Sequence, residues 1–168
     1  MSRRFRPPVS SSPRRGVTTW TLDVDEVERE LVVRLLGELR ELLSAAGDDP
    51  DAATSPVLRR LFPPAYPDDE EKEAEYQRLM RDELITSRLA QLDAVSARLS
   101  ADGSAPMDEA EVTALMRSLN AVRIVLGTML DVGEDDDVGA GEEGDDHEPE
   151  RQLYAYLSWL LDWTVRAL

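Results

Sequence analysis

The sequence contains no cysteine, and its single histidine, His147, lies in a run of acidic residues and glycines. Without cysteine the chain has no disulfide scaffold, no thiolate-bound zinc or iron–sulfur cluster, no cysteine nucleophile and no thiol redox switch. A histidine in such a run has no fixed neighbours to hold it as a metal ligand. Glycine-rich phosphate loops and a serine nucleophile elbow are missing as well. We therefore expect a protein that is not an enzyme, with no catalytic residue, no metal and no cofactor.

Long hydrophobic runs are also missing. No stretch approaches the roughly 18 uncharged apolar residues that a membrane-spanning helix needs. The arginines near the N-terminus are followed by prolines and serines, where an export signal would have an apolar segment. The sequence therefore predicts a cytoplasmic protein with no membrane contact.

Basic residues are few, because 19 Lys and Arg face 35 Asp and Glu and leave a net charge of −16. This excess of negative charge repels phosphate backbones and disfavours direct nucleic-acid binding. Residues 1–15 are the exception, since they hold five arginines and no acidic residue. These arginines are Arg3, Arg4, Arg6, Arg14 and Arg15. We interpret 1–15 as a basic arm or the first strand of a hairpin, and 132–148 as an acidic flexible insert.

One segment near the N-terminus has the pattern of a β-strand. Residues 17–22 are mostly β-branched or aromatic, and Thr18, Trp20 and Leu22 fall on one face at period two. The expected partner strand is 3–6, with residues 10–16 as the turn. The sequence thus predicts a short N-terminal β-hairpin, which must pack on helices to be stable.

The rest of the chain carries helical patterns. Apolar residues recur at a period of 3.6, and Asp23, Asp68 and Asp108 are each followed three residues later by Glu, as in a capping box. Pro149 suits the first turn of a last helix. These signals place the main helices at about 23–46, 68–100, 108–130 and 149–168, with a short helical turn at 56–62.

The predicted fold is therefore mainly α, a bundle of four main helices with a short N-terminal β-hairpin. The length of 168 residues suits a single domain over 1–168. Its helical core is expected at 16–131 and 149–168.

The helix predicted at 108–130 carries a polar strip beside its apolar face. On a helical wheel Arg123 falls inside the apolar arc, and Asn120, Gly127 and Asp131 border it. In one interpretation Arg123 bridges two helices through an acid such as Asp131 or Asp162, and Gly127 admits a neighbouring element. In the other, the strip lines a small polar pocket for a ligand or peptide.

Two further segments combine aromatic residues with other signals. The proline-rich segment 61–69 is either a docking epitope or a rigid corner between helices. Its candidate residues are Phe62, Pro63, Pro64, Tyr66 and Asp68. The last helix is apolar around most of its circumference, so that it is either central to the core or shared with a partner, for example in a homodimer. Its aromatic residues are Tyr154, Tyr156, Trp159 and Trp163.

Three motifs together resemble a known family. The first is the Arg-Leu-Phe-Pro-Pro-Ala-Tyr run at 60–66, followed by the Asp pair at 68–69 and the segment 75–79. The second is the segment 119–131, which contains the Asn-x-x-Arg-x-x-x-Gly strip. The third is the segment 153–160 near the C-terminus. In this order they resemble an actinobacterial family first described as a domain of unknown function and encoded near the protease adaptor ClpS. Members of that family are described as oxidative-stress transcriptional regulators, the AosR family.

The resemblance implies a small helical regulator that acts through a protein partner, an RNA polymerase sigma factor, and raises the expression of cysteine biosynthesis genes. Sensing by a cysteine pair does not carry over to this chain, which has no cysteine. Two alternatives stay open. One is a direct DNA-binding regulator that uses the arginine-rich N-terminal arm, and the other is an accessory factor in ClpS-linked proteolysis.

Overall fold

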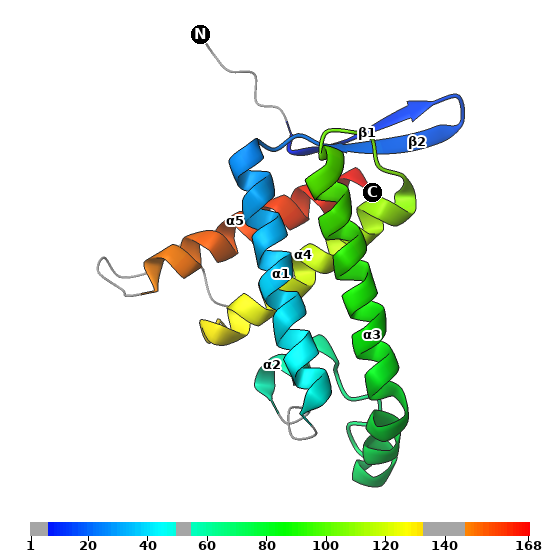
Figure 1. Ribbon diagram of the computed structural model, residues 1–168, viewed down its shortest axis with the longest axis vertical. Helices are drawn as coiled ribbons and strands as arrows, with labels where there is room; N and C mark the ends of the chain where they lie inside the picture. The colour runs from blue at the N-terminus through cyan, green and yellow to red at the C-terminus, as the bar shows by residue number, and fades with distance from the viewer. Residues whose placement is uncertain (1–6, 50–54, 133–146) are drawn as a thin grey trace.

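The computed structural model describes residues 7–49, 55–132 and 147–168. Over these ranges the chain forms one β-hairpin followed by helices (Figure 1). The elements are β1 (Val9–Arg14), β2 (Val17–Leu22), α1 (Glu26–Asp48), α2 (Pro56–Leu61), α3 (Glu70–Asp102), α4 (Glu109–Met129) and α5 (Glu148–Ala167). The predicted mainly α fold with four main helices and an N-terminal hairpin is confirmed, with α2 as the short additional helix.

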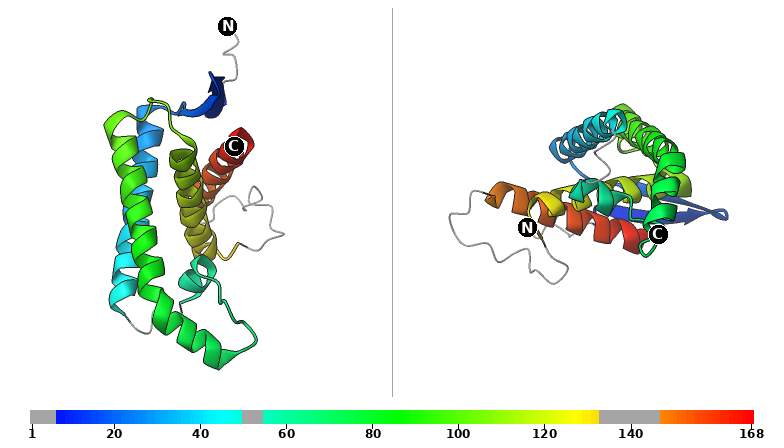
Figure 2. Two further views of the ribbon diagram at one scale, coloured as in Figure 1. Left: turned by 90° about the vertical axis from the view of Figure 1, so that its right-hand side faces the viewer. Right: turned by 90° about the horizontal axis from the view of Figure 1, so that it is seen from below.

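The long helices form layers around α4. Helices α1 and α3 lie side by side, α4 packs against both of them, and α5 covers the opposite side of α4 (Figure 2). The core lies at these contacts, where each long helix supplies leucines that are at most 1% exposed. They are Leu36, Leu43, Leu92, Leu115, Leu119, Leu157 and Leu160. The first turns of α3 bend away from α1 toward the side of α2 (Figure 2).

The hairpin differs from the prediction in its first strand. The partner of β2 is Val9–Arg14, not residues 3–6, which lie outside the described residues. The turn consists of Arg15 and Gly16 alone, and both have positive φ angles of 50° and 82°. Two residues with positive φ form the tight turn that matches the right-handed twist of a hairpin. This turn pairs Arg14 with Val17, and the register places the buried Val9 opposite Leu22.

Trp20 anchors the hairpin to the helices. Its N–H and carbonyl groups exchange hydrogen bonds of 2.9 and 2.7 Å with Met107, just before α4. Its indole Nε1 donates a 2.7 Å hydrogen bond to the carbonyl of Ala167 at the end of α5. The side chain is 5% exposed, as is expected for a large apolar group in the core. Trp20 therefore connects the hairpin to both α4 and α5.

The helix caps confirm one prediction and correct two. Asp108 and Glu111 form the predicted capping box of α4. Helix α1, however, is capped by Asp25 with Glu28, because the N–H of Asp23 still donates a hydrogen bond to the carbonyl of Pro8, just before β1.

Helix α3 is capped by Asp69, one residue after the predicted Asp68. The Asp69 carboxylate accepts a hydrogen bond from the N–H of Lys72. Since the residue three positions after this cap is a lysine, the reciprocal half of a capping box is not formed. Pro149 occupies the first turn of α5 as predicted.

Candidate functional site

Arg123 holds α4 against α5. Its Nε donates a 2.8 Å hydrogen bond to the hydroxyl of Ser158, and its guanidinium carbon lies 5.0 Å from the centroid of the Tyr154 ring. Such a cation–π contact contributes about 0.5–1 kcal/mol or more when it is shielded from water. Arg123 therefore bridges the two helices, as the structural interpretation predicted, but its partners are a hydroxyl and an aromatic ring.

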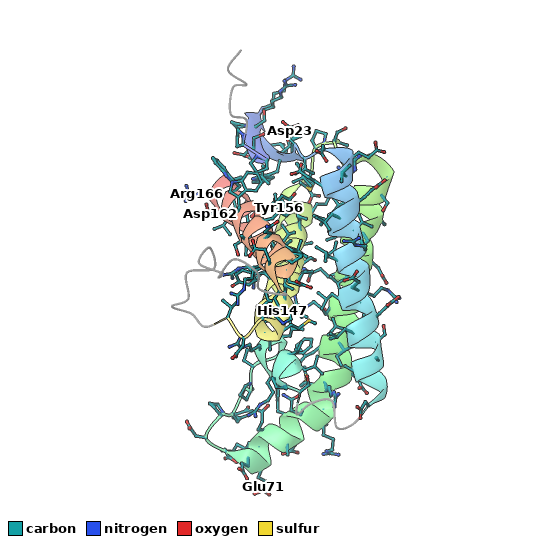
Figure 3. All side chains as sticks on the ribbon, turned by 90° about the vertical axis from the view of Figure 1, so that its left-hand side faces the viewer. Asp23, Glu71, His147, Tyr156, Asp162 and Arg166 are labelled. Atoms are coloured by element: carbon teal, nitrogen blue, oxygen red, sulfur yellow. The ribbon has the colours of Figure 1, made fainter. Side chains whose placement is uncertain are left out.

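The expected carboxylate partners of Arg123 have other roles. Asp162 forms an ion pair of 2.9 Å with Arg166, and both lie on the side of α5 away from α1 (Figure 3). Asp131 is exposed at the end of α4. The prediction that Asp131 or Asp162 pairs with Arg123 is therefore wrong. The helical wheel correctly placed Arg123 on the buried side of α4, but it did not identify the residues of α5 that contact it.

Gly127 allows α5 to approach α4 closely. A Cβ atom at this position would lie 2.8 Å from Cε2 of Tyr154, which is closer than two carbon atoms pack. The Tyr154 ring is only 8% exposed and is also in contact with Arg123. The position of Gly127 predicted a close approach by a neighbouring element, and in the structure the ring of Tyr154 in α5 occupies this space.

Asp131 ends α4. Its φ of 52° is left-handed, the N–H of Val132 donates to the carbonyl of Gly127 at 2.9 Å, and its own N–H donates to the carbonyl of Thr128 at 3.3 Å. These two bonds around a left-handed residue form a Schellman motif, which satisfies carbonyl groups that a helix end leaves free. The backbone of Asp131 therefore forms the C-terminus of α4.

We expect Asp131→Gly to raise the free energy of unfolding by about 0.5–1 kcal/mol, because glycine adopts positive φ without strain. Asp131→Ala is expected to lower it by a similar amount, since alanine is strained there and lacks the short polar side chain. Urea denaturation of both variants measures the difference. An alanine variant more stable than the glycine variant contradicts this account of the helix end.

Asn120 lies apart from the rest of the strip and faces a groove between α2, α3 and α4. The groove has a volume of about 600 Å³. Its lining residues are Arg60, Leu61, Phe62, Pro63, Tyr76, Leu84, Ser87, Arg88, Gln91, Arg117, Asn120, Ala121 and Ile124. Three of them are arginines and none is acidic. Of the four strip residues only Asn120 lines this groove, together with the beginning of the proline-rich segment.

Sequence reasoning missed this groove because its arginines come from three separate segments. Arg60 is in α2, Arg88 in α3 and Arg117 in α4. Burial, and then the positive charge of Arg117, lower the pKa of Arg88 from its usual value. No single one of these three segments shows a motif that indicates the groove.

The proline-rich segment forms a corner between α2 and α3. The N–H of Tyr66 donates a 2.8 Å hydrogen bond to Oε2 of Glu73, and the Tyr66 carbonyl accepts one of 3.2 Å from Asp69. The rings of Tyr66 and Tyr76 meet edge to face at 6.1 Å. The half-buried Phe62 and the exposed Pro63 line the groove, and Pro64, Tyr66 and Asp68 are exposed as well. The segment is thus fixed at both ends but retains an exposed aromatic residue.

The aromatic residues of α5 lie on two faces. Tyr154 is buried against α4, whereas Tyr156, Trp159 and Trp163 share another side of the helix. The rings of Tyr156 and Trp159 are 5.9 Å apart, and Trp159 is 39% exposed. Burial and the negative charge of Glu28 raise the pKa of Tyr156, whose position Figure 3 marks. Among the described residues its hydroxyl has no hydrogen-bond partner.

Other candidate groups lie at the ends of the described ranges. His147 directly precedes α5, and within the described ranges no three His, Asp or Glu side chains are placed to hold a metal ion. The acidic residues at 133–146 and the arginines at 3, 4 and 6 lie outside those ranges, while Arg14 and Arg15 are exposed at the hairpin turn. In this part of the chain no helix has the length and apolar character to cross a membrane.

A model of the family described as "Domain of unknown function (DUF2017)" matches residues 2–168. The match spans the hairpin, every helix described above and the residues that line the groove. No curated protein and no solved structure shows significant similarity to the chain.

Proposed function

Since the chain belongs to the DUF2017 family, whose description states no function, we propose that it is a non-enzymatic regulatory protein that acts through protein–protein contacts. The resemblance of its three motifs to oxidative-stress regulators makes an RNA polymerase sigma factor the first partner to test. Because the chain has no cysteine, the interaction is expected to be independent of thiol oxidation.

The observation that supports this proposal is the outward face of α5. Trp159 is 39% exposed, and its ring lies 5.9 Å from that of the half-buried Tyr156 on the same face of the helix. An exposed tryptophan beside a tyrosine is typical of protein interaction surfaces, where these two residue types dominate binding energies. In contrast, Arg123 and Gly127 are used in packing α4 on α5 and offer no reactive group to solvent.

The proposal is tested by binding of the purified chain to RNA polymerase core enzyme and to each sigma factor of the same cell, at low and moderate salt. We expect one sigma factor to bind equally well with and without a thiol reductant. Trp159→Ala is expected to weaken this binding about 30-fold, as for an interface residue worth about 2 kcal/mol.

Tyr66→Ala is the matched control, because Tyr66 is another exposed aromatic residue, at 46%, but lies in the corner between α2 and α3. It is expected to leave the affinity unchanged. Loss of binding in Tyr66→Ala alone would move the interface to the proline-rich segment. Failure to recover any polymerase or sigma subunit contradicts the proposal.

A further inference from the structure

The groove between α2, α3 and α4 is positively charged, although the protein as a whole is acidic. Arg60, Arg88 and Arg117 line it together with no carboxylate, although the chain as a whole carries a net charge of −16. Several arginines elsewhere form ion pairs with acids, for example Arg40 with Asp93 at 2.6 Å and Arg98 with Glu111 at 3.0 Å. The distribution of charge therefore sets the groove apart from the rest of the surface.

Among the described residues, the three groove arginines form no ion pair with an acid. Arg60 lies 3.4 Å from the Thr128 hydroxyl, and the guanidinium carbon of Arg88 lies 6.0 Å from the centroid of the Phe62 ring. Arg117 is exposed and adds a second positive charge near Arg88. A half-buried cation that faces another cation destabilises the folded protein unless an anion compensates it. An external anion would satisfy all three guanidinium groups.

The remaining lining residues suit an organic molecule. Asn120 and Ser87 offer polar side chains, while Phe62, Leu84 and Ile124 provide an apolar wall. A volume of about 600 Å³ lies within the range of about 300–1,000 Å³ that is typical of small-molecule sites. Guanidinium groups bind phosphate through paired, charge-assisted hydrogen bonds. The groove thus combines donors for phosphate with a surface for a ring.

From this arrangement we infer that the groove binds a phosphorylated small molecule of the nucleotide class, with its phosphates on Arg60, Arg88 and Arg117 and its ring against the apolar wall. A compact ligand fits the charge distribution better than a polymer does. An acidic peptide or a nucleic-acid strand extends beyond the groove onto the acidic surface, where it is repelled. A molecule that ends within the groove meets only the three cations.

The test measures binding of ATP, ADP and inorganic pyrophosphate by calorimetry at about 50 mM salt, where charge interactions are only partly screened. We expect saturable binding with a dissociation constant below about 1 mM. Arg117→Gln and Arg88→Met are each expected to weaken it at least about 10-fold, since each removes charge-assisted hydrogen bonds. Arg78→Gln is the matched control, because Arg78 is an exposed arginine of α3 outside the groove. This control is expected to bind as the unchanged protein does.

Stability distinguishes a binding role from a structural one. Without ligand, Arg88→Met is expected to melt at the same or a higher temperature, because it removes an unpaired charge and keeps the aliphatic stem. Added ATP is expected to raise the melting temperature of the unchanged protein but not that of Arg88→Met.

Three results would overturn the inference. The first is that ATP, ADP and inorganic pyrophosphate all fail to show saturable binding. The second is a marked loss of stability in unliganded Arg88→Met. The third is that a polyglutamate peptide binds in the groove although these three compounds do not. Trp159→Ala is expected to bind ATP normally, because α5 does not line the groove. This inference therefore stands or falls independently of the proposed sigma-factor contact.

Discussion

Replacing Trp20 by alanine is expected to lower the free energy of unfolding by about 3–5 kcal/mol, the usual cost of removing a large aromatic side chain from a core. Trp20 is 5% exposed and is the residue through which β2 contacts both the start of α4 and the end of α5. Typical domains are stable by only about 5–15 kcal/mol, so that this one change removes a large share of the total. Urea denaturation followed by far-ultraviolet circular dichroism measures the loss.

Two variants separate burial from other contributions of Trp20. Trp20→Phe keeps most of the apolar packing but loses the hydrogen bond to the carbonyl of Ala167. The lost hydrogen bond is expected to lower the free energy of unfolding by about 1 kcal/mol, in addition to the effect of the smaller ring. Trp159→Ala removes the same type of side chain from a position that is 39% exposed, and its effect is expected to be clearly smaller. Equal losses in Trp20→Ala and Trp159→Ala would contradict the anchoring role of Trp20.

Gly127→Ala is expected to destabilise the protein by about 1–3 kcal/mol, although alanine is the better helix former by about 1 kcal/mol. The reason is the ring of Tyr154, which a Cβ at position 127 would meet at 2.8 Å. This ring is buried between the two helices and is held by Arg123, so that α5 has to move away from α4. Thermal and urea denaturation both report the change.

Gly37→Ala in α1 is the matched control. Apart from its chain neighbours and the backbone of α1 itself, nothing lies within 4 Å of a Cβ built at Gly37, so alanine is expected to stabilise the protein by up to about 1 kcal/mol. The same gain is expected for Gly127→Ala in a Tyr154→Leu background, where the ring is absent, and the double-mutant cycle yields the coupling energy. If Gly127→Ala stabilises the otherwise unchanged protein, then α5 does not depend on close approach at this position.

Local signals in the sequence predicted most of the helices. The capping box of Asp108 and Glu111 is confirmed, because only one such pair lies before that apolar run. Before α1 two overlapping pairs compete, and the choice of Asp25 over Asp23 depends on the hydrogen bond between Asp23 and Pro8. Such a contact belongs to the tertiary structure and has no local signature. The serines and the proline at 10–13 are typical of a turn, but in the structure they belong to β1, and the turn consists of Arg15 and Gly16.

The sites were harder to predict than the helices. The period of 3.6 placed Arg123 and Gly127 correctly on the buried side of α4, but it contains no information about which residues of α5 meet them. Charge favoured an acid as the partner of Arg123, whereas the structure supplies Ser158 and Tyr154. The arginine groove depends on the packing of three helices, and no motif in any one of them indicates it.

The two-residue turn of the hairpin also determines how its outer edge meets other chains. In an antiparallel pair of strands, residue pairs that hydrogen-bond to each other alternate with pairs whose backbone N–H and C=O groups point outward. Arg14 and Val17, next to this turn, form a hydrogen-bonded pair. The next pair, Pro13 with Thr18, therefore directs its backbone to the free edges. Proline has no N–H there, so a strand from a second molecule finds a gap in the row of donors. The outer edge of β1 is thereby less suited to edge-to-edge pairing with another chain.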